Sequence, residues 1–131
     1  MKKKILLVED DLLIREMYES ELIRAGYQVT ACSSGEDGIK ALLKDHFDLA
    51  LLDIMLPGIN GLEVLKQIKQ HPQTKNIRVV LLTNLGHETV IKTGFELGAI
   101  GYLIKSAYTP DQVIKEVKSF MDGTNLSVSP I

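Results

Sequence analysis

The sequence contains few of the side chains that form disulfides or bind soft metals. Cys32 is the only cysteine, which excludes an internal disulfide and a zinc site built from several thiolates. The histidines, His46, His71 and His87, are scattered without the spacing of a metal site. We therefore expect these histidines to be surface residues and not metal ligands.

Long apolar stretches are also absent. The longest runs are four or five residues, far below the roughly 20 residues that span a bilayer. Lysines at positions 2–4 resemble the start of a signal peptide, but Glu9 and Asp10 interrupt the apolar run that follows them. We therefore expect a cytoplasmic chain with no membrane partner.

Neither sign of charge is in large excess. The chain has 15 basic and 17 acidic residues, mixed along its length, for a net charge of −2. Such a balance produces no long-range field that would attract nucleic acid. We expect no direct nucleic-acid partner.

What the sequence does contain is four short apolar runs that each end in polar residues. Continuous runs of this length, separated by amphipathic segments, are typical of parallel strands buried on both faces. The functional groups of such sheets lie beyond the carboxyl ends of the strands, so these polar residues should meet in one crevice. The runs are 5–8, followed by Glu9 and Asp10; 49–52, followed by Asp53; 79–82, followed by Thr83; and 100–104, followed by Lys105.

Strand and helix patterns alternate five times in 131 residues, which predicts one α/β domain. Segment 27–32 alternates apolar and polar residues and indicates an edge strand. This favours a flavodoxin-like, doubly wound, five-stranded parallel sheet of order 2-1-3-4-5 with five helices. We expect the domain over residues 1–121 and a mobile tail over residues 122–131. The other expected strands are 4–8, 47–52, 77–82 and 100–104, and the expected helices are 11–25, two short helices after Ser34 and Asn60, 87–97 and 110–121.

Capping residues mark the ends of these helices. Thr109, Pro110 and Gln112 have the spacing of a capping box with proline in the first turn. Gly26 stops the first helix. That helix is predicted from the near-helical spacing of its apolar residues, which are Leu12, Leu13, Met17, Leu22 and Ile23.

Over residues 3–121, the chain resembles the receiver domain of two-component response regulators, and within that family the single-domain, chemotaxis-regulator-like members. Family receivers carry an acidic pair after the first strand and a phospho-accepting aspartate after the third. A serine or threonine follows the fourth strand, and a lysine follows the fifth. The matching residues are Glu9 and Asp10, Asp53, Thr83 and Lys105, with a loop at Pro57 and Gly58 and a switch aromatic at Tyr102.

The acidic residues predict a magnesium site. Three carboxylates a few ångströms apart repel one another unless a hard cation and an amine neutralise them. An oxygen-only set suits Mg²⁺, which is the expected cofactor. We expect Asp10 and Asp53 as direct ligands and Glu9 as a ligand through water; the resemblance adds the backbone carbonyl of Met55.

The resemblance also implies the reaction. Asp53 would accept a phosphoryl group from the phosphohistidine of a sensor histidine kinase or phosphotransfer protein, with Lys105 and Thr83 completing the catalytic set. Alignment and charge neutralisation supply most of the catalysis in such transfers. The chain would modify itself and later lose the phosphate to water, so we expect no enzyme in the turnover sense.

The family mechanism implies a switch through two residues. The hydroxyl of Thr83 would bind a phosphoryl oxygen, and the ring of Tyr102 would turn inward. This would remodel the surface formed by the fourth helix, the fifth strand and the fifth helix, where a downstream protein would bind. We expect a monomer or a phosphorylation-dependent homodimer.

Two alternatives remain open from the sequence. Receivers usually have a small residue after the Ser/Thr and a cis proline after the lysine, but here Asn84 and Ser106 occupy these positions. These departures are the only support for a pseudo-receiver that binds proteins independently of phosphorylation, and the intact acidic residues argue against it. The other alternative is a Mg²⁺-dependent phosphatase of the Asp-x-Asp class, which is disfavoured because Met55 occupies the position of the second acid.

Overall fold

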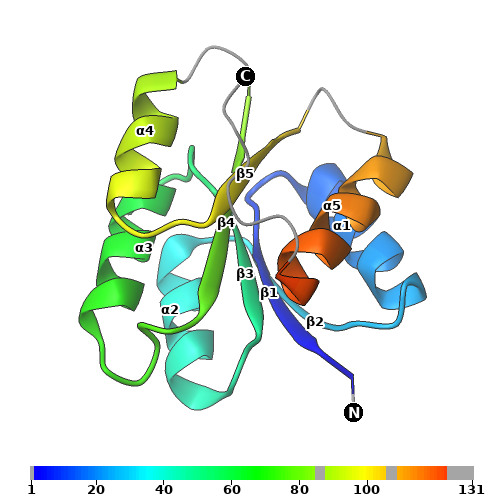
Figure 1. Ribbon diagram of the computed structural model, residues 1–131, viewed down its shortest axis with the longest axis horizontal. Helices are drawn as coiled ribbons and strands as arrows, with labels where there is room; N and C mark the ends of the chain where they lie inside the picture. Colours follow the sequence, from blue (N-terminus) through cyan, green and yellow to red (C-terminus); the bar gives the residue numbers. More distant parts are fainter. Residues whose placement is uncertain (1, 85–87, 106–108, 124–131) are drawn as a thin grey trace.

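The computed structural model describes residues 2–84, 88–105 and 109–123. Figure 1 shows a single parallel sheet between two layers of helices. In these described segments, no helix has the length and apolar character needed to span a membrane. The strands are β1 (Lys4–Val8), β2 (Gln28–Cys32), β3 (Leu49–Asp53), β4 (Arg78–Thr83) and β5 (Gly101–Ile104), and the helices are α1 (Leu12–Arg24), α2 (Gly35–Lys44), α3 (Gly61–Gln70), α4 (Glu88–Glu96) and α5 (Pro110–Asp122).

The strand order is β2-β1-β3-β4-β5, and every pair is parallel, which confirms the predicted flavodoxin-like topology. β2 lies at an edge, as its alternating pattern indicated. In the register, Val8 is opposite Leu52 and Asp53 is opposite Leu82. The carboxyl ends of the central strands therefore lie at one edge of the sheet, where the polar residues were expected to meet.

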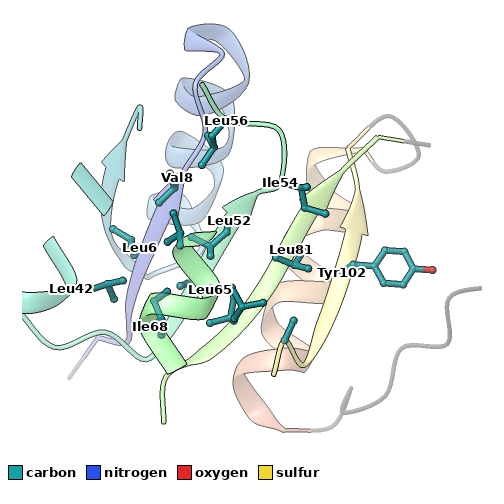
Figure 2. Close-up of a cluster of buried hydrophobic side chains, with 14 of the residues drawn as sticks. Leu6, Val8, Leu42, Leu52, Ile54, Leu56, Leu65, Ile68, Leu81 and Tyr102 are labelled. Carbon is teal, nitrogen blue, oxygen red and sulfur yellow. The ribbon is translucent and has the colours of Figure 1, made fainter. Parts of the chain in front are cut away.

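Both faces of the sheet are buried, which explains the continuous apolar runs. Leu6 and Val8 point into a cluster formed with α2, α3 and α4, whereas Ile5 and Leu7 point into a second cluster formed with α1 and α5. In Figure 1 these two sets of helices cover opposite faces. Figure 2 shows the first cluster, with side chains of β1, β3 and β4 meeting those of α2 and α3.

Among the described residues, four helices begin at a side-chain cap. Asp11, Ser34, Asn60 and Thr109 each accept a hydrogen bond from the backbone N–H three residues later. The capping box predicted at Thr109 is confirmed, with Gln112 bonded back to the backbone of Thr109. These caps fix where α1 and α3 begin, immediately beside the expected site.

The helix predicted over residues 11–25 is confirmed, but most of the apolar residues that predicted it do not face the core. The buried side chains of α1 are Tyr18 and Leu22. Helical spacing shows that a segment can be a helix, but when apolar residues occur on several sides it does not show which side is covered. The exposed apolar residues of α1 are Leu12, Leu13, Met17 and Ile23, which are 41–77% exposed.

The end of α5 is hydrogen-bonded to the first residue of β4. Arg78 Nη1 donates to the carbonyl oxygens of Phe120 (3.1 Å) and Met121 (2.6 Å). Gly123 ends the helix in the left-handed region with φ 77°. These contacts satisfy carbonyls that have no partner within the helix. Residues 124–131, which make up most of the expected tail, lie outside the described residues.

Candidate functional site

The residues singled out at the strand ends lie together. Glu9 directly follows β1, and Asp53 and Thr83 are the last residues of β3 and β4. Lys105 directly follows β5, and its backbone N–H donates to the carbonyl of Thr83 at 2.8 Å. The parallel register therefore brings an acidic, a hydroxyl and an amine group to the same edge of the sheet.

Three carboxylates form the centre of this site. Glu9, Asp10 and Asp53 each offer an oxygen, and these oxygens all lie within 4.8 Å of one another. Glu9 and Asp53 are buried, whereas Asp10 is exposed. The cluster is therefore accessible to solvent on the side of Asp10.

Lys105 joins the two buried acids. Its Nζ lies 2.9 Å from Glu9 Oε1 and 3.0 Å from Asp53 Oδ2, and its side chain is 10% exposed. Burial acts to lower the pKa of Lys105, but the hydrogen bonds to Glu9 and Asp53 outweigh it, so the pKa is raised above 10.5. The amine is therefore a permanent cation at neutral pH.

Glu9 has an unusual environment for a carboxylate. Its Oε1 accepts from Lys105, and its Oε2 accepts from the backbone N–H of Asp11 at 3.0 Å. Burial nevertheless raises the pKa of Glu9 from 4.5 to about 7, because the two hydrogen bonds do not fully replace water and the neighbouring Asp53 repels a negative charge.

This pKa predicts how the stability of the metal-free protein depends on pH. Folded Glu9 holds its proton more tightly than unfolded Glu9, so its contribution to stability is complete below pH 4.5 and is lost as the pH rises through about 7. We expect the unfolding free energy to fall by roughly 1–2 kcal/mol across this range. This is less than the change in free energy that corresponds to the whole pKa shift of Glu9 from 4.5 to about 7. The measurement is urea denaturation in EDTA from pH 4.5 to 8. Glu9→Gln should remove this part of the slope, and parallel curves for the two proteins would contradict the assignment.

In the β1–α1 loop, the residue that caps α1 is not one of the three acids of the cluster. Asp11, and not Asp10, caps α1 by accepting the N–H of Ile14 at 3.0 Å. Arg15 Nη1 donates to the carbonyl oxygens of Glu9 (2.8 Å) and Asp10 (3.3 Å). The sequence reasoning missed Arg15; the available signal was a cation in the first turn of the helix that follows the acidic pair.

The β3–α3 loop surrounds Asp53 with backbone. The N–H of Met55 donates to Asp53 Oδ1 at 3.1 Å. Gly58 has φ 73°, and a side chain there would meet the Glu36 carboxylate, which accounts for glycine in the expected turn. Gly61 lies so close to the end of β3 that a Cβ atom would be 2.3 Å from the carbonyl oxygen of Asp53.

Thr83 and Tyr102 lie on adjacent strands. Thr83 is buried, and its hydroxyl donates to the carbonyl of Asn84 at 3.1 Å. Tyr102 is opposite Leu81, is 4% exposed, and packs edge-on against Phe95 of α4 with ring centroids 6.2 Å apart. In Figure 2 its ring points past the β5 edge of the sheet. The Lys105–Ser106 peptide bond falls outside the described residues.

The donors of the cluster suit a hard divalent cation. They are carboxylate oxygens, and the exposed position of Asp10 leaves room for the waters that Mg²⁺ retains. Glu9, Asp10 and Asp53 could therefore hold such an ion. The geometry and the chemistry of the donors agree on this point.

The comparison with known families settles the kind of domain. The family model described as "Response regulator receiver domain" matches residues 5–118. The chain belongs to this family. As a receiver domain it is a signalling domain of two-component systems and not a conventional enzyme.

Curated relatives are longer than this receiver. It is 42% identical over 101 residues to the transcriptional regulatory protein AfsQ1 of Streptomyces coelicolor, covering 77% of this chain and 44% of that protein. It is 35% identical over 118 residues to the transcriptional regulatory protein ResD of Bacillus subtilis, covering 90% of this chain and 48% of that protein. The chain thus spans about half the length of these relatives. Because they are named as transcriptional regulators, the expectation of no nucleic-acid partner is not supported, and we do not retain it.

A solved structure shows the same fold. A putative response regulator from Chloroflexus aurantiacus has a TM-score of 0.86 and 35% identity, covering 93% of this chain and 99% of that one. The Mn²⁺-bound form of response regulator Rcp1 has a TM-score of 0.79 and 31% identity, covering 90% and 93%. A similar receiver thus binds a divalent metal.

Proposed function

We propose that this receiver is phosphorylated on Asp53 by a sensor histidine kinase or phosphotransfer protein in the cytoplasm. The observation that carries the proposal is the position of Lys105, which contacts Asp53 and Glu9 from the side of β5. A cation at this point neutralises charge on the acceptor and on an incoming phosphoryl group. Phosphoryl transfer depends mainly on such positioning and neutralisation.

The reaction forms one bond and breaks another. A carboxylate oxygen of Asp53 attacks the phosphorus of the phosphohistidine, and the phosphorus–nitrogen bond breaks with its electron pair returning to the imidazole. Asp10 and Asp53 would hold Mg²⁺, with the Met55 carbonyl as a third ligand and Glu9 acting through water. The bound ion would offset negative charge on the transferring group. Water later attacks the acyl phosphate, so each chain accepts one phosphoryl group and releases it as phosphate in each cycle.

Exposed apolar side chains next to the site give a protein donor a surface to contact. Leu12 and Leu13 follow Asp11, the residue after the acidic pair, and Met55 lies two residues after Asp53. They are 55%, 77% and 58% exposed. A donor protein whose histidine reaches Asp53 would contact these three side chains, and this apolar contact would favour binding.

Signalling would use the surface formed by α4, β5 and α5. A phosphoryl group adds roughly −1.5 to −2 charge and three acceptor oxygens beside Thr83. The hydroxyl of Thr83 would turn toward these oxygens, and Tyr102 would move with respect to Phe95 and α4. A downstream protein, or a second copy of the chain, would bind the altered surface. We further propose that residues 1–121 form the receiver and that a tail follows over residues 122–131, although α5 itself ends at Asp122.

The test is intact mass after incubation with acetyl phosphate and Mg²⁺. We expect one phosphoryl adduct that hydroxylamine removes, that EDTA prevents, and that is absent in Asp53→Asn. Asp111→Asn, an exposed acid on α5, is the matched control and should be phosphorylated normally. A chain that binds Mg²⁺ but forms no adduct would overturn the proposal in favour of a pseudo-receiver.

A further inference from the structure

Arg15 contacts the backbone of the acidic loop. It lies in the first turn of α1, and its Nη1 donates to the carbonyls of Glu9 and Asp10 at 2.8 and 3.3 Å. Within residues 2–84, 88–105 and 109–123, Arg15 forms no ion pair with a carboxylate within 4.0 Å. Its contacts with the site are therefore its hydrogen bonds to these two carbonyls.

These contacts complete the support of the β1–α1 loop. The N–H of Glu9 donates to the carbonyl of Cys32, and the N–H of Asp11 donates to the Glu9 carboxylate. The N–H of Arg15 donates to the carbonyl of Asp11, as in a regular helix. Two carbonyls, those of Glu9 and Asp10, point instead toward the guanidinium. Arg15 thus joins the helix to the two residues that directly follow β1.

Asp10 depends on this support more than the other acids do. Glu9 and Asp53 are buried and bound by Lys105, whereas the side chain of Asp10 is exposed and contacts solvent. Among the described contacts, Asp10 is held in place through its backbone carbonyl. A ligand held in this way is positioned only as well as its loop.

We infer that Arg15 is a positioning residue that orders Glu9 and Asp10 for a divalent cation. The inference rests on the proposed metal site and concerns a residue outside the ligand set. Two effects of Arg15 oppose each other. Its positive charge repels a cation, whereas its hydrogen bonds fix the loop before the cation arrives, and supporting contacts of this kind are needed for tight metal sites.

Because these effects oppose each other, the direction in which Mg²⁺ affinity changes when Arg15 is replaced shows which effect is larger. The experiment is a calorimetric Mg²⁺ titration of the unphosphorylated Arg15→Met variant, with stability measured separately in urea. We expect the dissociation constant for Mg²⁺ to rise about tenfold, as for other residues that hold metal ligands in place. If Arg15 acted through charge alone, its removal would tighten Mg²⁺ binding, and that result would overturn the inference.

Two further variants control for charge and for folding. Arg24→Met removes the same charge from the other end of α1, about 13 Å away along the axis, and should leave the dissociation constant unchanged within a factor of two. Arg15→Lys keeps the charge but has no planar fork with which to bind two carbonyls. Its binding should be intermediate, and it provides the measurement if Arg15→Met does not fold.

The two proposals fail in different ways. If the wild-type chain binds no Mg²⁺, both the metal site and the role of Arg15 are wrong. If the wild type binds Mg²⁺ and Arg15→Met and Arg15→Lys both bind as tightly, only the role of Arg15 is wrong. Weaker binding in Arg24→Met equal to that in Arg15→Met would also overturn it, because the loss would then follow from damage to α1 in general.

Discussion

Lys105→Met is expected to lose about 3 kcal/mol of unfolding free energy at pH 8 in EDTA, the cost typical of removing one partner from a buried ion pair. Methionine keeps most of the length and apolar stem of lysine but leaves Glu9 and Asp53 facing each other without a cation. The measurement is urea denaturation. Phosphorylation of Asp53 by acetyl phosphate should also slow, because the amine would no longer offset charge on the transferring group.

The reason for this loss can be tested in the same assay. The cost should shrink as the pH falls below 7, because Glu9 then takes up a proton and only one charge is left without a partner. It should also shrink when Asp53→Asn is already present, because the two residues interact directly. Lys92→Met, at an exposed position on α4, is the matched control and should change stability by less than about 0.5 kcal/mol. An equal loss at all pH values and in both backgrounds would contradict the ion-pair explanation.

Gly61→Ala is expected to have a comparable effect through the fold. A Cβ atom at this position would lie 2.3 Å from the carbonyl oxygen of Asp53 and 2.8 Å from the Cα atom of Ile54. Both are backbone atoms, so β3 and α3 would have to separate, at a cost of about 3 kcal/mol. Because β3 carries Asp53, the phosphorylation rate should fall together with the stability. Urea denaturation and intact-mass kinetics measure the two effects.

Gly94→Ala provides the comparison. The added Cβ atom would lie 2.2 Å from Leu81 Cδ1, the far end of a flexible side chain that can change its rotamer. We expect a smaller loss, about 1 kcal/mol, and no change in phosphorylation. If Gly61→Ala were as stable and as readily phosphorylated as the wild type, the close packing of α3 against the end of β3 would not be what positions Asp53.

The sequence was sufficient for the sheet because each strand is buried on both faces. Ile5 to Val8 had to be continuously apolar, since alternate residues enter opposite cores. The position of the site followed from the same pattern, because parallel strands end at one edge. The chemical identity of the site followed from residues far apart in the sequence, such as Glu9 and Lys105, whose contact at 2.9 Å the structure shows.

Other features of the structure could not be predicted from the spacing of residues in the sequence. Four of the five apolar residues used to predict α1 are exposed; the fifth, Leu22, is buried together with Tyr18, which was not among them. A helix with apolar residues on several sides is positioned by its neighbours and not by its own pattern. Arg15 was missed because its partners are backbone carbonyls, which are the same in every sequence. The raised pKa of Glu9 likewise depends on burial in three dimensions.

The bond between Arg78 and the end of α5 determines how distant a following segment is from the phosphorylation site. Arg78 begins β4 and Thr83 ends it, so α5 ends about one strand length, or about 17 Å, from the edge of the sheet that carries Asp53. A polypeptide continuing past Gly123 would begin at this remote end. Its point of attachment would therefore lie too far from Asp53 to contact the phosphoryl group, so an effect at that point would require a displacement of α5, whose last turn Arg78 binds.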